Sequence, residues 1–76
     1  MEVKVYSTPT CPYCKMLKQY LDSKSITYQN FDVSVDNEAL DQMVKVSGQM
    51  GVPVIVVGDE VIVGFEKARI DSLLGI

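Results

Sequence analysis

The sequence of 76 residues has no histidine, no tryptophan and only two cysteines. A closed zinc site needs four Cys or His ligands, so this chain cannot build one alone. It has seven Lys and Arg residues against ten Asp and Glu residues, for a net charge of −3, and the basic residues form no run. This charge pattern argues against nucleic acid as a partner.

Long hydrophobic runs are also missing. No apolar stretch approaches the ~20 residues that span a bilayer, and the opening "MEVKVY" lacks the regions of a signal peptide. We therefore expect a cytoplasmic protein with no membrane partner. The length predicts one domain over residues 1–76, and the 47% of hydrophobic residues should suffice for its core.

Hydrophobic periodicity predicts the order strand, helix, strand, helix, strand, strand, helix. The predicted strands cover residues 2–7, 26–33, 53–57 and 61–64. The first helix runs to residue 23 with Pro12 at its first position, the second is capped by Ser34 or Asp36, and the third starts near Glu66. The first two predicted strands, joined through the first helix, should be parallel, and the last two should form an antiparallel pair. Together they predict an α/β fold with a four-stranded mixed sheet between helices on both faces.

The two cysteines, Cys11 and Cys14, lie in "TCPYCK" between the first strand and the first helix. As a structural disulfide they would close too small a loop to stabilise the fold much. As metal ligands they would need thiols from outside the chain. As a redox couple they need one nucleophilic thiol within disulfide reach of the other, and a CxxC pair at a strand-to-helix turn supplies this.

The predicted helix assigns a role to each thiol. Cys11 precedes the first turn, where unpaired N–H groups and the helix dipole favour a thiolate. Lys15 and Lys18 add positive potential. Cys14 lies inside the helix and should be more buried. We therefore expect Cys11 to attack and Cys14 to resolve.

Pro53 stands at the head of the predicted strand "PVIVV". A cis Val52–Pro53 bond would present the backbone of Val52 to an extended thiol peptide, whereas a trans bond would merely begin the strand. The residues alone leave both open.

"CPYC" after a strand, "GVP" before a β-branched strand and the element order together resemble a glutaredoxin, a member of the thioredoxin-fold superfamily. The resemblance spans essentially the whole chain. It implies a thioredoxin-like fold with three helices, a cis Pro53, and thiol–disulfide oxidoreductase activity through Cys11 and Cys14. It also implies no bound cofactor, glutathione as reducing co-substrate, disulfide-bearing proteins as partners, and a monomer. The residues expected at the glutathione or substrate groove are Thr8, Pro12, Tyr13, Lys15, Val52, Pro53, Gly64, Phe65 and Glu66.

The chain departs from the family pattern at three positions. Typical glutathione-dependent members carry Lys where Thr8 stands, and "GGxD" where this chain has "GFEK", so that Phe65 and Lys67 replace Gly and Asp. The "GF" resembles glutaredoxin-like redoxins that are reduced by thioredoxin reductase and serve ribonucleotide reductase. That reductant, and a glutaredoxin dimer bridging an iron–sulfur cluster through two Cys11 thiolates, remain alternatives.

Overall fold

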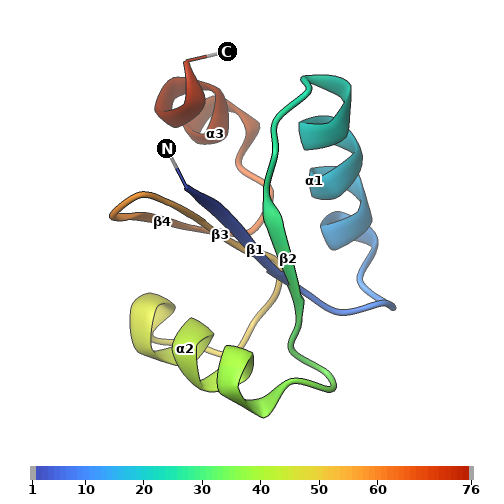
Figure 1. The fold of residues 1–76 in the computed structure, drawn as a ribbon, viewed down its shortest axis with the longest axis vertical. Helices are drawn as coiled ribbons and strands as arrows, with labels where there is room; N and C mark the ends of the chain where they lie inside the picture. Colours follow the sequence, from blue (N-terminus) through green and yellow to red (C-terminus); the bar gives the residue numbers. More distant parts are fainter. Residues whose placement is uncertain (1, 76) are drawn as a thin grey trace.

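The computed structural model describes residues 2–75 and has the predicted order of elements (Figure 1). The strands are β1 (Val3–Ser7), β2 (Gln29–Asp32), β3 (Val54–Val57) and β4 (Glu60–Val63), and the helices are α1 (Pro12–Ser23), α2 (Asn37–Ser47) and α3 (Lys67–Leu74). Within these residues, no helix is both long and apolar enough to cross a membrane.

The four strands form one mixed sheet in the order β2-β1-β3-β4. β1 is parallel to β2 and antiparallel to β3, and β3 is antiparallel to β4. The register pairs Tyr6 with Val54, and Val54 with Val63. The end of β1, the start of β3 and the end of β4 therefore lie at the same edge of the sheet.

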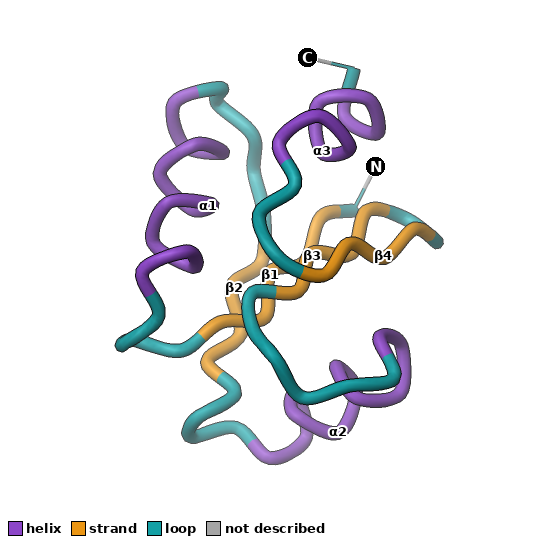
Figure 2. The backbone as a smooth tube through the Cα atoms, turned by 180° about the vertical axis from the view of Figure 1, so that it is seen from behind, coloured by secondary structure: helices purple, strands orange, loops and turns teal. Residues whose placement is uncertain are grey.

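Each face of the sheet carries its own apolar cluster. α1 and α3 cover one face and α2 covers the other (Figures 1 and 2). The face under α1 and α3 buries Val3, Val5, Leu17, Leu21, Ile55, Val57, Ile62 and Ile70. The face under α2 buries Tyr6, Val33, Ala39, Met43 and Val54. The predicted mixed sheet between helices on both faces is confirmed.

Local sequence signals explain the helix ends. Pro12 occupies the first position of α1, where its missing N–H costs nothing. Of the two predicted caps of α2, Asp36 is the N-cap, because its carboxylate accepts a hydrogen bond from the Ala39 N–H at 3.1 Å. Gly48 ends α2 with a left-handed φ of 72°.

The strands differ from the predicted ranges at their ends. β2 covers Gln29–Asp32 rather than residues 26–33, because Ile26 and Tyr28 contact the core from the connecting loop. β3 begins at Val54 because Pro53 has no N–H for the ladder. β4 begins at Glu60, which pairs with Val57 across the two-residue turn 58–59.

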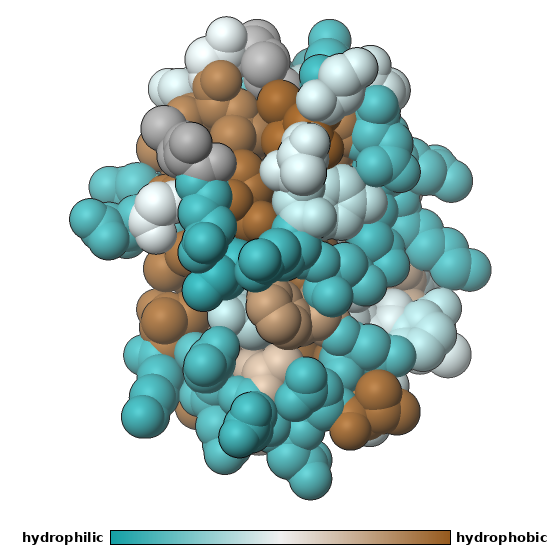
Figure 3. Space-filling view, in the orientation of Figure 1, coloured by the Kyte–Doolittle hydropathy of each residue, from teal (hydrophilic) through white to brown (hydrophobic). Residues whose placement is uncertain are grey.

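Met16, Met43 and Met50 differ in how far they are buried. Met43 is fully buried, whereas Met16 is 47% exposed and Met50 is 68% exposed. Apolar side chains also appear among hydrophilic ones on the face shown in Figure 3, and they gather near α3. Helical spacing alone does not separate an inward methionine from one on the surface.

Candidate active site

Cys11 is the N-cap residue of α1, directly after the loop that leaves β1. Its sulfur accepts a hydrogen bond from the backbone N–H of Cys14, with 3.1 Å between N and Sγ. The N–H groups of a first helical turn have no partner within the helix, and the helix dipole is positive at this end. A backbone donor and the positive end of the helix therefore face the Cys11 sulfur.

Cys14 has a different environment, although both cysteines are free thiols. Its side chain is fully buried in the first turn of α1. Burial, with a smaller effect from its hydrogen bond to Cys11, raises the pKa of the Cys14 thiol to about 11, against a lowering effect of the Thr8 backbone and the Lys18 charge. At neutral pH the Cys14 thiol keeps its proton.

The loop before β3 lies directly opposite Cys11. The Val52–Pro53 peptide bond is cis, as the resemblance implied, and Pro53 is fully buried. The carbonyl oxygen of Val52 is 3.9 Å from the Cys11 sulfur. The fold thus brings together two segments that are 41 residues apart in the sequence.

Gly64 joins this edge from the end of β4. Its N–H donates a hydrogen bond to the carbonyl of Pro53 at 2.8 Å, and its φ of +85° suits glycine. Thr8 joins from the end of β1, because its carbonyl accepts a hydrogen bond from the Cys11 N–H at 3.4 Å. Four of the predicted groove residues, Thr8, Val52, Pro53 and Gly64, therefore adjoin Cys11 or one another.

Phe65 turns toward the α1–α3 side of the sheet. It packs against the core cluster there, and its ring centroid is 5.8 Å from that of Tyr20. The resemblance implied a place for Phe65 in the glutathione or substrate groove, whereas an aromatic residue just before α3 can also anchor that helix to the core. These contacts favour the anchoring role.

Glu66 and Lys67 are both engaged on α3. Glu66 is the N-cap residue of α3, without a side-chain cap, and its carboxylate lies 3.4 Å from the Arg69 guanidinium. The Lys67 ammonium lies 3.5 Å from the Asp71 carboxylate and 5.2 Å from the centroid of the Tyr20 ring. The charge of Lys67 is therefore paired at the contact between α1 and α3.

Pro12, Tyr13 and Lys15 all lie on the first turn of α1 and are exposed. Tyr13 is 62% exposed, which is unusual for a large aromatic side chain without a partner. The three residues surround the buried Cys14 in the sequence and flank Cys11. Their contact with a bound thiol remains a prediction.

A polar chain behind the two thiols was not foreseen. The Lys18 ammonium donates to the hydroxyl of Ser7 at 3.5 Å, and that hydroxyl donates to the amide oxygen of Asn30 at 2.8 Å. Lys18 had been expected only to add positive potential. Its spacing of four residues from Cys14 places both on one helix face and was a usable signal. Nothing in the sequence singled out Ser7 or Asn30.

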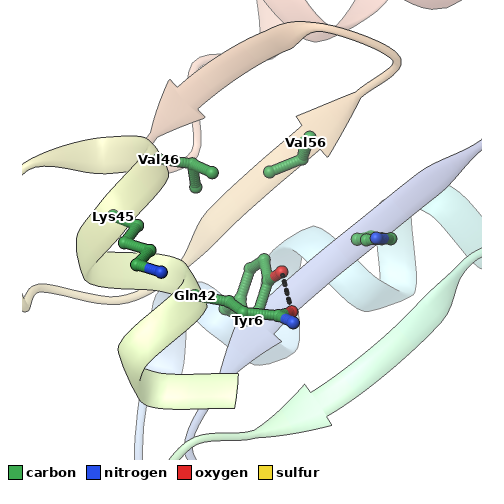
Figure 4. Close-up of a pocket in the computed structure, with 6 residues that line it drawn as sticks. Tyr6, Gln42, Lys45, Val46 and Val56 are labelled. Carbon is green, nitrogen blue, oxygen red and sulfur yellow. Dashed lines mark hydrogen bonds between the residues drawn. The ribbon is translucent and has the colours of Figure 1, made fainter. Parts of the chain in front are cut away.

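Two hollows of the described surface lie away from Cys11. One lies between α2 and the sheet and is lined by Lys4, Tyr6, Gln42, Lys45, Val46 and Val56, with the Tyr6 hydroxyl 3.5 Å from the Gln42 amide oxygen (Figure 4). Another is lined by Glu2, Val3, Thr27, Tyr28 and Gln29. Neither is lined by a cysteine, so the Cys11 sulfur does not lie in either hollow.

Comparison with known proteins matches residues 3–62 to the glutaredoxin family model. The chain is 49% identical to a glutaredoxin-like 8.6 kDa protein in a rubredoxin operon of Clostridium pasteurianum, over 95% of this chain and 96% of that protein. It is 36% identical to a glutaredoxin of Neisseria meningitidis, over 95% and 94% of the two chains.

The fold is similar to that of a mutant of the thioredoxin-like protein BC3987. That structure superposes with a TM-score of 0.94 and 31% identity, over 99% of this chain and 96% of the other. The family model covers most of the chain, and the strand order and the two neighbouring free cysteines agree with it. The chain therefore belongs to the glutaredoxin family of the thioredoxin superfamily and is a thiol–disulfide oxidoreductase.

Proposed function

We propose that the protein reduces protein disulfides and glutathione mixed disulfides in the cytoplasm, with glutathione as its reductant. Cys11 is the attacking thiol and Cys14 the resolving thiol. The observation that carries this assignment is the hydrogen bond of 3.1 Å from the Cys14 N–H to the Cys11 sulfur, next to a fully buried Cys14 thiol. A thiolate is the nucleophile in disulfide exchange, so the sulfur that is stabilised as an anion attacks first.

The reaction takes two exchanges. The Cys11 thiolate attacks one sulfur of a substrate disulfide, forms a mixed disulfide and releases the other substrate sulfur as a thiolate that takes a proton. The Cys14 sulfur then attacks Cys11, a Cys11–Cys14 disulfide forms, and the second substrate thiol leaves with the proton that Cys14 gives up. Two molecules of glutathione restore the dithiol and leave as glutathione disulfide.

The backbone around Val52 is the proposed binding site for the substrate peptide. Its carbonyl is 3.9 Å from the Cys11 sulfur, so a peptide bound beside Val52 presents its own sulfur to Cys11. Backbone pairing of this kind binds an extended peptide with little demand on its sequence. A similar structure, 25% identical with a TM-score of 0.77 over 96% of this chain and 73% of the other, is a buckwheat glutaredoxin–glutathione complex.

The charges around this binding site predict weaker glutathione binding than in glutaredoxins that carry Lys where Thr8 stands. Thr8 offers a hydroxyl where a cation would meet a carboxylate, which forgoes a charge-assisted hydrogen bond worth about 1.5–3 kcal/mol. Exposed Lys15, on the first turn of α1 after Cys11, is the cation that we assign to this purpose. The pairing of Lys67 with Asp71 reduces the repulsion that Lys67 would exert on the glutathione ammonium.

Thioredoxin reductase is the second candidate reductant, because Thr8 supplies no cation for glutathione and Phe65 packs against the core. The decisive assay compares NADPH oxidation with glutathione plus glutathione reductase and with thioredoxin reductase, using one disulfide substrate. We expect turnover with glutathione at a raised half-saturating concentration. No rate with glutathione and a robust rate with thioredoxin reductase would overturn this choice of reductant.

A further inference from the structure

The buried thiol of Cys14 has to lose its proton in the second exchange, yet the apolar interior penalises the thiolate that forms. The side chain is fully buried. The cation on the same helix face that can offset this penalty is the ammonium of Lys18, one turn further along α1.

The position of Lys18 is fixed by a partner beside Cys14. Its ammonium donates to the hydroxyl of Ser7 at 3.5 Å, and Ser7 is 99% buried, with 1% of its surface exposed. The Ser7 hydroxyl is held in turn by Asn30, 2.8 Å away on β2. Thr8, the residue after Ser7, is the backbone partner of the Cys14 thiol. Lys18 and Cys14 therefore contact consecutive residues at the end of β1.

We propose that Lys18, held by Ser7 and Asn30, is a positioning residue for the resolving step, and that its ammonium stabilises the Cys14 thiolate as that thiolate attacks the mixed disulfide. The proposal rests on the proposed roles of Cys11 and Cys14. It adds Lys18 as the group that allows the buried Cys14 thiol to react as a thiolate. In this step the Cys14–Cys11 bond forms, the Cys11–substrate bond breaks, and the departing substrate thiolate takes up the proton of Cys14. Lys18 keeps its own proton throughout.

The other groups near Cys14 do not supply this charge. Cys11 is an uncharged disulfide partner at this stage, and Ser7 and Asn30 are neutral. Asp32 of β2 pairs with Ser7 in the sheet register, but its carboxylate accepts hydrogen bonds from the N–H and hydroxyl of Ser34. Lys15 is adjacent to Cys14 in the sequence but is exposed to solvent, which screens its charge.

A chromophoric disulfide separates the two exchanges in one experiment. With one equivalent of 5,5′-dithiobis(2-nitrobenzoate), attack by Cys11 releases the first coloured thiolate and attack by Cys14 releases the second. Stopped-flow absorbance then gives both rates between about pH 6 and 9. We expect Lys18→Met to leave the first phase unchanged and to slow the second about tenfold at neutral pH, moving its pH profile about one unit higher.

Two variants control for structure and for overall charge. Lys18→Arg keeps the charge and should restore most of the second phase. Lys45→Met removes the same charge from the exposed surface of α2 and should leave both phases unchanged. An unchanged second phase in Lys18→Met, or a second phase slowed equally in Lys18→Arg, would overturn the proposed role of Lys18. If Cys11→Ser still released the first thiolate in the fast phase, the proposed function itself would fail.

Discussion

The backbone N–H of Cys14 donates to the sulfur of Cys11 at 3.1 Å, while the thiol of Cys14 is fully buried. One residue thus donates its backbone N–H to the neighbouring sulfur, while burial keeps its own sulfur a protonated thiol. This difference between two chemically identical side chains arises from the helix: Cys11 stands at its N-cap and Cys14 within its first turn.

Alkylation should reveal this difference directly. Because burial raises the pKa of Cys14 to about 11, only roughly one Cys14 thiol in ten thousand is ionised at pH 7. We expect iodoacetamide to modify Cys11 at least ~100-fold faster than Cys14 at neutral pH, as assigned by mass spectrometry of the peptides. Faster modification of Cys14 would show that the assigned roles are reversed.

The Thr8→Lys variant tests the proposed glutathione groove. A lysine here restores a charge-assisted bond to a glutathione carboxylate, and we expect the half-saturating glutathione concentration to fall about tenfold. The measurement is the coupled assay with glutathione reductase. Thr10→Lys is the matched control, because it adds the same charge to the same exposed loop. An equal fall in both variants would mean that position 8 does not contact glutathione.

The contact between α1 and α3 predicts a sensitivity to acid. The hydrogen bond from the Tyr20 hydroxyl, more than the charge of Lys67, lowers the pKa of Asp71 below its usual value of 3.8. The folded state therefore binds this proton less readily than the unfolded chain. The resulting stabilisation is present above the usual pKa and is lost as the pH falls through the lowered one.

Thermal unfolding between about pH 2 and 6 checks this prediction. Tyr20→Phe removes the principal cause of the shift, so the melting temperature of the variant should fall less steeply with acid than that of the unaltered protein. Asp71→Asn should flatten the same region. Parallel curves for all three proteins would contradict the assigned role of this contact.

Gly64 should be costly to replace. Its φ of +85° disfavours a side chain, although nothing lies within 4 Å of the place where a Cβ would stand. We expect Gly64→Ala to lower the free energy of unfolding by about 1–2 kcal/mol, and Gly64→Asn by less, since Asn adopts left-handed conformations more readily. Urea unfolding of the two variants measures the difference. Equal stability of Gly64→Ala and the unaltered protein would show that the strain is absent.

The sequence was sufficient for the elements and for the thiol pair. Short-range signals placed them: alternation for the strands, Pro12 at the start of α1 and Asp36 before α2. The cis geometry of Pro53 was not determined by local residues and followed from the family resemblance. Local patterns were weakest at strand ends, where Ile26 and Tyr28 alternate like strand residues but contact the core from a loop.

Contacts between distant segments could not be predicted in the same way. The chain from Lys18 through Ser7 to Asn30 joins three elements, and its hydrogen bonds span 11 and 23 residues. Lys67 replaces the Asp of the family pattern, and nothing in its sequence neighbourhood indicated that it would pair with Asp71 and face Tyr20. These placements depend on how α1, α3 and the sheet pack together, which no window of sequence contains.

Trapping with Cys14→Ser tests the central claim most directly. This variant keeps the attacking thiol and lacks the resolving one, so with a protein disulfide as substrate it should accumulate a covalent complex through Cys11 and lose most of its turnover. It should still act on small glutathione mixed disulfides, because glutathione itself resolves that intermediate, whereas Cys11→Ser should lose both activities. Mass spectrometry of the non-reduced complex, alongside both rates, gives the answer. A trapped adduct at Cys11 is the predicted result, and reduction of the protein disulfide by Cys14→Ser at the unaltered rate would contradict the dithiol mechanism.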